Sequence, residues 1–269
     1  MDAKAIEGAQ SLAESARERM PALIEKIRYR IKPIDLGGCY SLLSGYHQRL
    51  GVYDYFVEGH IYDLKQHFYT ANQLEQACVG LESHSPTLAT HHTFLYGLLS
   101  DSPAVINWLK TADSDQMRQE RDNPRLPWFY NHMTQLVLLD KWDALPAKIE
   151  KAAQKAGKGL REKFASGQDF HSLLLKRDKT GLEQLLTNEA RKRQGDPLLE
   201  DWIAEASTWR AKLCWLKGIP VQIDSPLVPM ELMPIQPLAH YDDVYDFLQP
   251  GWVPPSQGIV GRVSRWLKR

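Results

Sequence analysis

Leu98-Leu99-Ser100-Asp101-Ser102-Pro103 separates two runs of residues in which apolar side chains recur at helical spacing. The leucine pair closes the first run. The Asp and Ser side chains can accept hydrogen bonds from the free backbone N–H groups at the start of a second helix, and proline is tolerated in a first helical turn. This short phrase therefore predicts a helical hairpin, in which two antiparallel helices are joined by a tight turn.

The chain repeats the phrase twice, at Leu138-Leu139-Asp140-Lys141-Trp142 and at Leu174-Leu175-Lys176-Arg177-Asp178. The spacing between successive copies of the phrase falls within the roughly 33–47 residues that are typical of stacked helical hairpins. A fourth helix, Trp202 to Leu216, should end where the next leucine pair would stand, and we expect the leucine pairs to be buried. The sequence thus predicts an all-α fold of stacked antiparallel hairpins with a tetratricopeptide-like tendency to form a solenoid. The expected hairpins are Leu88–Leu109, Tyr130–Ala153 and Phe170–Arg191.

We expect one helical domain over residues 1–269, with an N-terminal helical half at 1–112 and the hairpin repeats at 128–218. The polar stretch between Thr111 and Pro127 is the best candidate for a boundary inside it. Residues 219–269 form a proline-rich tail that cannot be regular helix, and its apolar side chains predict that it packs on the body of the protein. A short helix, Tyr241 to Leu248, fits between two of these prolines.

The first eighty residues predict further helices. Apolar spacing favours helix from Ala3 to about Arg30, and Pro21 either kinks this helix or, as the preferred reading, occupies the first turn of a second one. Asp35 should start the next helix and Gly51 should end it. A separate helix is expected over Thr70–Leu81.

Composition excludes several classes of function. Lys plus Arg equal Asp plus Glu at 33 each, so no bulk charge favours nucleic acid or an anionic membrane. No apolar stretch approaches the roughly 20 residues that span a bilayer, and the first residues do not resemble a secretory leader. The three cysteines are far apart and odd in number, which argues against a disulfide framework. We therefore expect a cytoplasmic protein.

The sequence contains no catalytic motif for a nucleophile, a metal or a phosphate-binding loop. His60 and His67 could lie on one face of a helix, and histidines placed in this way can serve in acid–base catalysis. An ordinary structural or surface histidine pair is the simpler interpretation. A metal set of Cys78, His84, His91 and His92 is disfavoured, because adjacent histidines on a helix point about 100° apart. We predict no cofactor, no metal and no enzymatic activity.

Two acidic clusters are the candidate partner-binding residues. In the first cluster the carboxylates stand next to aromatic rings, and such a patch can bind a protein partner, particularly a basic one. A solvated helix face is the alternative interpretation. The second stands at the start of a helix, where the helix dipole alone would favour it. A basic run between Lys151 and Lys163 is a solvated helix end in the simplest reading, with a phosphate or nucleic-acid patch as the alternative. The candidate partner-binding residues are Tyr241, Asp242, Asp243, Tyr245 and Asp246 in the first cluster, and Glu200, Asp201 and Glu205 in the second.

Several short phrases resemble the immunity protein 49 family of bacterial polymorphic-toxin systems. They are Asp63-Leu64-Lys65-Gln66-His67-Phe68-Tyr69-Thr70-Ala71, Tyr96-Gly97-Leu98-Leu99-Ser100-Asp101-Ser102-Pro103, Ile106-Asn107-Trp108-Leu109 and Ile223-Asp224-Ser225-Pro226-Leu227-Val228-Pro229. The resemblance runs from about Tyr53 to Leu248. The phrases are structural rather than catalytic, and the family pattern supplies no named inhibitory residues.

This resemblance implies an all-helical cytoplasmic protein that binds and neutralises a cognate toxin delivered by neighbouring cells. The expected toxin is a nuclease domain that is delivered by type VI secretion. This chain itself is expected to contact neither nucleic acid nor a membrane. Stacked hairpins offer extended surfaces for gripping a protein partner. Two alternatives stay open: a helical-repeat scaffold or chaperone-adaptor, and an enzyme that uses His60 and His67.

Overall fold

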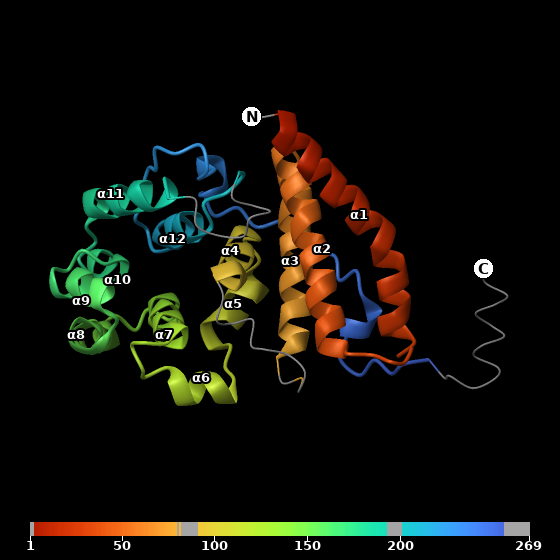
Figure 1. Cartoon of the computed structure of the whole chain (residues 1–269), viewed down its shortest axis with the longest axis horizontal. Helices are drawn as coiled ribbons and strands as arrows, with labels where there is room; N and C mark the ends of the chain where they lie inside the picture. Colours follow the sequence, from red (N-terminus) through yellow and green to blue (C-terminus); the bar gives the residue numbers. More distant parts are fainter. Residues whose placement is uncertain (1–2, 80, 82–90, 193–200, 256–269) are drawn as a thin grey trace. The chain divides into compact units, whose positions relative to one another are not determined.

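The computed structural model describes residues 3–79, 81, 91–192 and 201–255. Its regular elements are helices, and no β-strand occurs within these ranges, which confirms the predicted all-α class. The chain divides into two units (Figure 1): unit 1 combines residues 1–85 with 240–269, and unit 2 is residues 86–239. The division does not follow the polar stretch after Thr111, because the helices on either side of that stretch pack together in unit 2.

Unit 1 is built on three long helices, α1 (Ala3–Arg28), α2 (Leu36–Phe56) and α3 (Ile61–Cys78). Helix α2 packs against both of the others (Figure 1). Asp35 starts α2 as predicted, since its Oδ1 accepts a hydrogen bond of 3.1 Å from the backbone N–H of Gly38.

Three sequence predictions in unit 1 are wrong in the same direction, because the helices are longer than expected. Pro21 lies inside α1, and residues on both sides of it, such as Ala16 and Ile27, are buried in one core, so the helix does not restart there. Gly51 lies inside α2, where a Cβ atom would come within 2.9 Å of a ring carbon of Phe68. Close approach of α3, rather than a helix stop, explains this glycine. Thr70 is likewise interior to α3.

Unit 2 contains the three predicted hairpins, and the two helices of each one contact each other. Residues 88–90, the expected start of the first hairpin, lie outside the described residues. Ser102 and Asp178 cap the second helix of their hairpins, accepting from the backbone N–H groups of Val105 and Gly181 respectively. The hairpins are α4 (His91–Leu99) with α5 (Pro103–Thr111), α7 (Pro127–Leu138) with α8 (Leu145–Lys155), and α10 (Phe170–Leu175) with α11 (Lys179–Ala190).

The repeated phrase is a repeated helix-ending turn. Asp101, Asp140 and Arg177 stand at the middle of the three turns and have φ values of 56°, 58° and 53°. Gly218 ends the fourth helix with a φ of 70°. The backbone N–H groups just after Asp140, Arg177 and Gly218 bond back to the preceding helix, as Lys141 does to the carbonyl of Leu136 at 2.9 Å. Left-handed residues with such bonds satisfy the last free carbonyls of a helix. After Asp101, the N–H of Ser102 instead donates to the hydroxyl of Ser100 at 3.1 Å.

The leucine pairs are not equivalent in burial. Leu98, Leu138 and Leu174 are buried in all three copies. The second leucine is buried only in the first copy, and Leu139 is 37 % exposed. The expectation that both leucines are buried is therefore wrong for Leu139, which is the C-cap of α7, and Leu175 is only partly buried.

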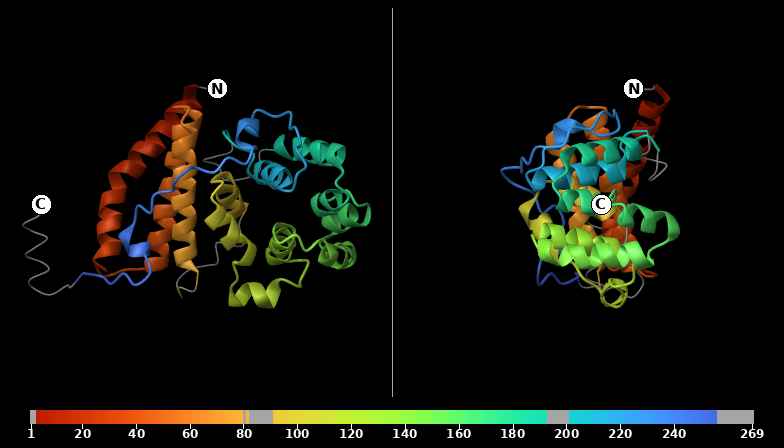
Figure 2. Two further views of the ribbon diagram at one scale, coloured as in Figure 1. Left: turned by 180° about the vertical axis from the view of Figure 1, so that it is seen from behind. Right: turned by 90° about the vertical axis from the view of Figure 1, so that its left-hand side faces the viewer.

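Helix α12 (Glu205–Leu216) contacts both α11 and α4, so the helices of unit 2 close into a ring. Figure 2 shows this ring from behind and from the side. An open tetratricopeptide-like stack would leave its last helix away from its first, so the solenoid tendency is not confirmed. Two shorter helices, α6 (Asp115–Glu120) and α9 (Lys158–Ala165), complete the ring.

The first part of the proline-rich tail packs on unit 2, as predicted. Val221, Val228 and Met233 are buried there, and the indole N–H of Trp215 donates to the carbonyl of Val221 at 2.9 Å. A short 3₁₀ turn, η3 (Met230–Leu232), follows within this part. The chain then returns to unit 1 at His240.

Two other expectations can be compared with the structure. Cys39, Cys78 and Cys214 are buried and unbridged, which confirms that the fold has no disulfide framework at these positions. None of the helices in the described part of the chain combines the length and the apolar character needed to cross a bilayer.

Candidate functional site

The candidate partner-binding residues of the tail lie on an extended segment, which we name the strap and define as residues 240–248. The predicted helix Tyr241–Leu248 is wrong, since only the 3₁₀ turn η4 (Asp246–Leu248) is helical and Tyr245 has extended backbone angles of −118° and 110°. Alternate side chains of an extended segment point to opposite sides. Tyr245 and Phe247 can therefore both enter the core, which a helix would not allow.

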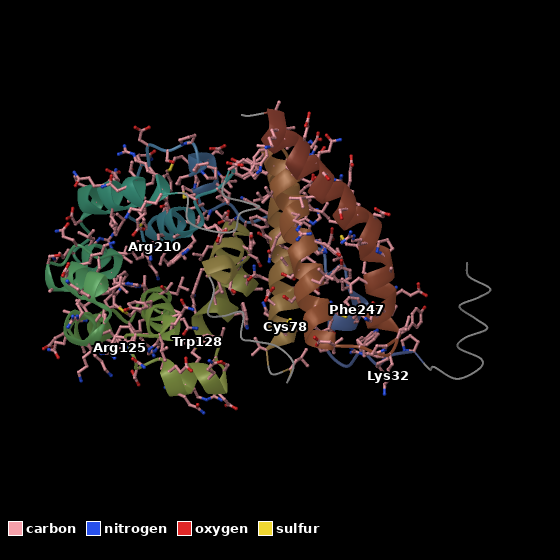
Figure 3. The ribbon with its side chains drawn as sticks, viewed as in Figure 1. Lys32, Cys78, Arg125, Trp128, Arg210 and Phe247 are labelled. Carbon is pink, nitrogen blue, oxygen red and sulfur yellow. The ribbon has the colours of Figure 1, made fainter. Side chains whose placement is uncertain are left out.

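The inward side chains of the strap are anchored on the bundle of unit 1. Asp243 Oδ1 accepts hydrogen bonds from the hydroxyl of Tyr69 at 2.7 Å and from the amide of Gln73 at 2.6 Å. The bond from Tyr69, followed by that from Gln73, holds the pKa of Asp243 below its usual range against the opposing effect of burial. The ring of Phe247 stacks on Tyr40, between α1 and α2 (Figure 3).

The backbone of the strap is also fixed to α3. The side-chain amide of Gln66 donates to the carbonyl of Asp242 at 2.9 Å and accepts from the N–H of the same residue at 2.9 Å. This pair of bonds satisfies an extended backbone that has no neighbouring strand. Arg28 adds an ion pair of 2.9 Å to Asp246 from α1.

Three other strap side chains point to solvent. The side chains of Asp242 and Asp246 are 61 % and 52 % exposed, and Val244 between them is 47 % exposed. We name these three residues the outward stripe. His240 pairs with Asp242 at 3.2 Å when protonated. The stripe therefore presents two carboxylates around one apolar side chain on a firmly held backbone.

A chain of hydrogen bonds runs inward from the strap. The hydroxyl of Tyr245 lies 2.7 Å from His47 Nε2, and His47 Nδ1 lies 2.8 Å from His67 Nδ1. His67 Nε2 in turn lies 3.1 Å from a carboxylate oxygen of Asp54. With both imidazoles neutral, His67 donates to Asp54, His47 donates to His67, and Tyr245 donates to His47, so every ring nitrogen in the chain is satisfied.

Burial keeps the first imidazole of this chain neutral. Desolvation, with a smaller contribution from His67, lowers the pKa of His47 to about 3. The phenol of Tyr245 also has its pKa raised by burial, which favours the O–H form that donates to His47.

His60 and His67 do not share one set of contacts. His60 stands at the N-cap of α3 and is exposed, with its Nδ1 3.4 Å from Asp63. His67 instead contacts His47 and Asp54. The structure therefore places the two histidines of the enzyme alternative in different surroundings.

The second acidic cluster is only partly described. Glu200 lies outside the described residues. Asp201 is exposed and precedes α12, and Glu205 is the first residue of that helix. Glu205 is buried, so its carboxylate belongs to the interior of unit 2 and the expected acidic surface does not include it.

The disfavoured metal set is also only partly described. Cys78 is buried, its thiol lies 3.5 Å from the carbonyl of Gly37, and burial raises its pKa to about 12. His84 and the side chains of His91 and His92 lie outside the described residues. Within the described ranges, no group of three or more His, Cys, Asp or Glu side chains could hold a metal ion.

Sequence reasoning missed the residues that hold the strap. A usable signal was present in α3, where polar and aromatic side chains that bind the strap recur at positions 66, 69 and 73, the spacing of one helix face. The missed residues are Arg28, His47, Asp54, Gln66, Tyr69 and Gln73.

No known family model matches this chain, and no curated protein or solved structure is significantly similar to it.

Proposed function

We propose that this protein is a stoichiometric inhibitor, an immunity protein that neutralises a cognate toxin by direct protein–protein binding in the cytoplasm. The short phrases that resemble the immunity protein 49 family support this proposal. The outward stripe of the strap carries it structurally, because Asp242, Val244 and Asp246 are held ready for contact by a backbone that is already fixed.

A pre-fixed surface favours tight binding for a simple reason. Association costs less when the contacting segment does not have to be ordered first. An apolar side chain flanked by two carboxylates suits a partner that has an apolar contact rimmed by Lys or Arg. A nuclease domain fits this description, since it keeps cations where it holds phosphates, and delivery by type VI secretion would bring it into the cell.

The first test is co-expression with the product of the neighbouring gene, followed by co-purification. We expect a one-to-one complex. If the wild-type chain does not bind that product, the immunity proposal fails. If it instead captures several unrelated proteins through one surface, the scaffold or chaperone-adaptor alternative replaces it.

The second test locates the surface by association and dissociation rates at low and high salt. The double variant Asp242→Asn/Asp246→Asn should slow association at low salt, because rim charges mainly steer encounter. Val244→Asp should raise the dissociation rate. The side chains of Asp242 and Val244 do not hold the strap, whereas Asp246→Asn also removes the ion pair with Arg28. Urea midpoints of the double variant and the wild type should therefore be compared first, and equal midpoints show that the fold of unit 1 is kept.

A matched control carries the same change in charge on other exposed acids, in the double variant Asp143→Asn/Asp224→Asn. We expect its rates to equal those of the wild type. If the control and the stripe variants behave alike, the stripe is not the contact surface, whatever the partner.

A further inference from the structure

Unit 2 carries two adjoining hollows that share Arg125. The first, which we name the aromatic cavity, has a volume of about 410 Å³. The second, the cationic hollow, has a volume of about 450 Å³. Both volumes lie in the range of small-molecule sites. The aromatic cavity is lined by the rings of Tyr130, Phe164 and Phe170 and by Leu126, Leu160 and Leu185, among others.

The cationic hollow gathers four positive side chains, namely Arg125, Lys151, Lys155 and Arg161. In the described part of the chain, none of the four makes an ion pair. The one carboxylate in the lining is that of Asp122, and it is already paired with Lys148 at 2.6 Å. Glu150, one turn from the hollow, accepts from Gln154 at 3.1 Å.

Four like charges around one hollow repel one another, and an anion placed among them would be attracted by all four. Their geometry is suited to an extended anion rather than to a single one. Lys151 and Lys155 are four residues apart and so share one face of α8, while Arg161 comes from α9. A chain of phosphate groups would meet both helices, and Arg125 reaches it from the segment before α7.

Two residues in the wall of the aromatic cavity hold polar atoms that are enclosed by the protein. Asp169 caps α10 with its Oδ1, whereas its buried Oδ2 has no hydrogen-bond partner among the described residues. Arg210 bonds to Glu189 at 2.5 Å, yet its buried Nε has no partner in the same ranges. Neither atom has appreciable accessible surface, so both belong to the wall. The polar contacts of a ligand would fall to other lining residues, such as Arg125, Asn131 and Lys163.

We propose that unit 2 binds a nucleotide, with its base in the aromatic cavity and its phosphates in the cationic hollow. A base stacks on aromatic rings, and the donors and acceptors at its edge can meet polar residues of the same lining, such as Asn131 and Lys163. Arg125 lines both hollows, and it joins the two halves of the site. Figure 3 labels Arg125 and Arg210, which lie at two sides of this region.

The site is tested by calorimetric titration of the full chain with adenosine triphosphate, adenosine and inorganic tripolyphosphate. We expect the nucleotide to bind at least about tenfold more tightly than either fragment, because only it fills both hollows. The triple variant Lys151→Gln/Lys155→Gln/Arg161→Gln should weaken nucleotide binding about tenfold or more and reduce its salt dependence. Leu160→Glu, at an exposed position on the cavity wall, should weaken both the nucleotide and adenosine.

A matched triple variant, Lys141→Gln/Lys179→Gln/Lys192→Gln, removes the same charge from exposed positions of unit 2 that line neither hollow. It should bind the nucleotide like the wild type. Saturable binding that is lost equally in both triple variants would overturn the proposal, because it would show a bulk charge effect. Tripolyphosphate binding as tightly as the nucleotide, or no nucleotide binding at all, would overturn it as well.

Discussion

A single buried lysine fixes the proline-rich tail on unit 2. The side chains of Lys212 and Asp101 are 1 % and 0 % exposed, and their charged atoms lie 2.6 Å apart. The ammonium also donates to the carbonyls of Leu232 at 2.6 Å and Pro234 at 3.0 Å. Its three donors are thereby used, which is the condition under which a buried ammonium is tolerated.

Replacing this lysine should therefore destabilise the protein strongly. We expect Lys212→Met to lower the free energy of unfolding by roughly 3–5 kcal/mol, because it leaves the carboxylate of Asp101 buried without its cation. Urea denaturation followed by circular dichroism measures the change. Lys141→Met, at an exposed position, should change stability by no more than about 0.5 kcal/mol. Equal midpoints for the two variants would contradict this account of the tail.

At the scale of elements, the helix-ending turns of unit 2 are tied to one another. Lys217, at the end of α12, donates to the carbonyl of Leu138 at 3.1 Å and pairs with Asp140 at 2.7 Å. Arg177, in the turn before α11, donates to the carbonyl of Gly218 at 3.2 Å. Three of the four repeated turns therefore meet, and these contacts tie the ends of α7, α10 and α12 together.

The different burial of the two leucines at the second turn predicts different costs for replacing them. Leu138→Ala should destabilise by roughly 2–5 kcal/mol, because a buried leucine loses transfer energy and leaves a cavity. Leu139→Ala should cost well under half as much, since this side chain is 37 % exposed. Urea midpoints of the two variants provide the comparison. If the cost at 139 equalled the cost at 138, burial would not be what the repeated phrase encodes.

The left-handed turn that ends α12 gives a second prediction at this scale. Gly218→Ala should destabilise by about 1–2 kcal/mol, because a Cβ atom is unfavourable at a φ of 70°. Gly159→Ala, inside α9 with no atom near the added Cβ, should instead stabilise by about 0.5–1 kcal/mol. Thermal unfolding of both variants tests the sign, and a shift in the same direction for both would refute the argument.

At the scale of the whole molecule, buried histidines make both units sensitive to acid. Burial is the largest cause that lowers the pKa of His47 in unit 1 to about 3, and it does the same for His171 in unit 2. Burial, with Lys148 and Arg121, lowers the pKa of His132 to about 4. As the pH falls below about 6.5, the unfolded chain takes up these protons before the folded chain does.

Stability should therefore decrease as the pH falls from about 6.5 toward 4, by up to about 1.4 kcal/mol per pH unit for each buried histidine. Urea midpoints at about pH 7.5 and pH 5 measure this dependence. The variant His47→Gln keeps hydrogen-bonding atoms for Tyr245 and His67 but does not titrate, so it should show a weaker dependence in unit 1. A dependence equal to that of the wild type would exclude His47 as a contributor.

The sequence determined the local structure of this protein. The hairpins, their caps at Ser102 and Asp178, and their turns were readable, because capping and left-handed turns depend on a few adjacent residues. Burial of the tail was readable from its composition. Helix lengths in unit 1 were not, because Pro21 and Gly51 are tolerated only through the packing around them.

Only the tertiary structure decided which side chains come together. The strap is extended rather than helical because Asp243, Tyr245 and Phe247 each find a partner far away in the sequence. Local propensity could not reveal such partners. The basic run after Lys151 lines a hollow only because α8, α9 and Arg125 meet there. Contacts between distant segments are set by the summed packing of the whole unit, and no short stretch of sequence encodes that sum.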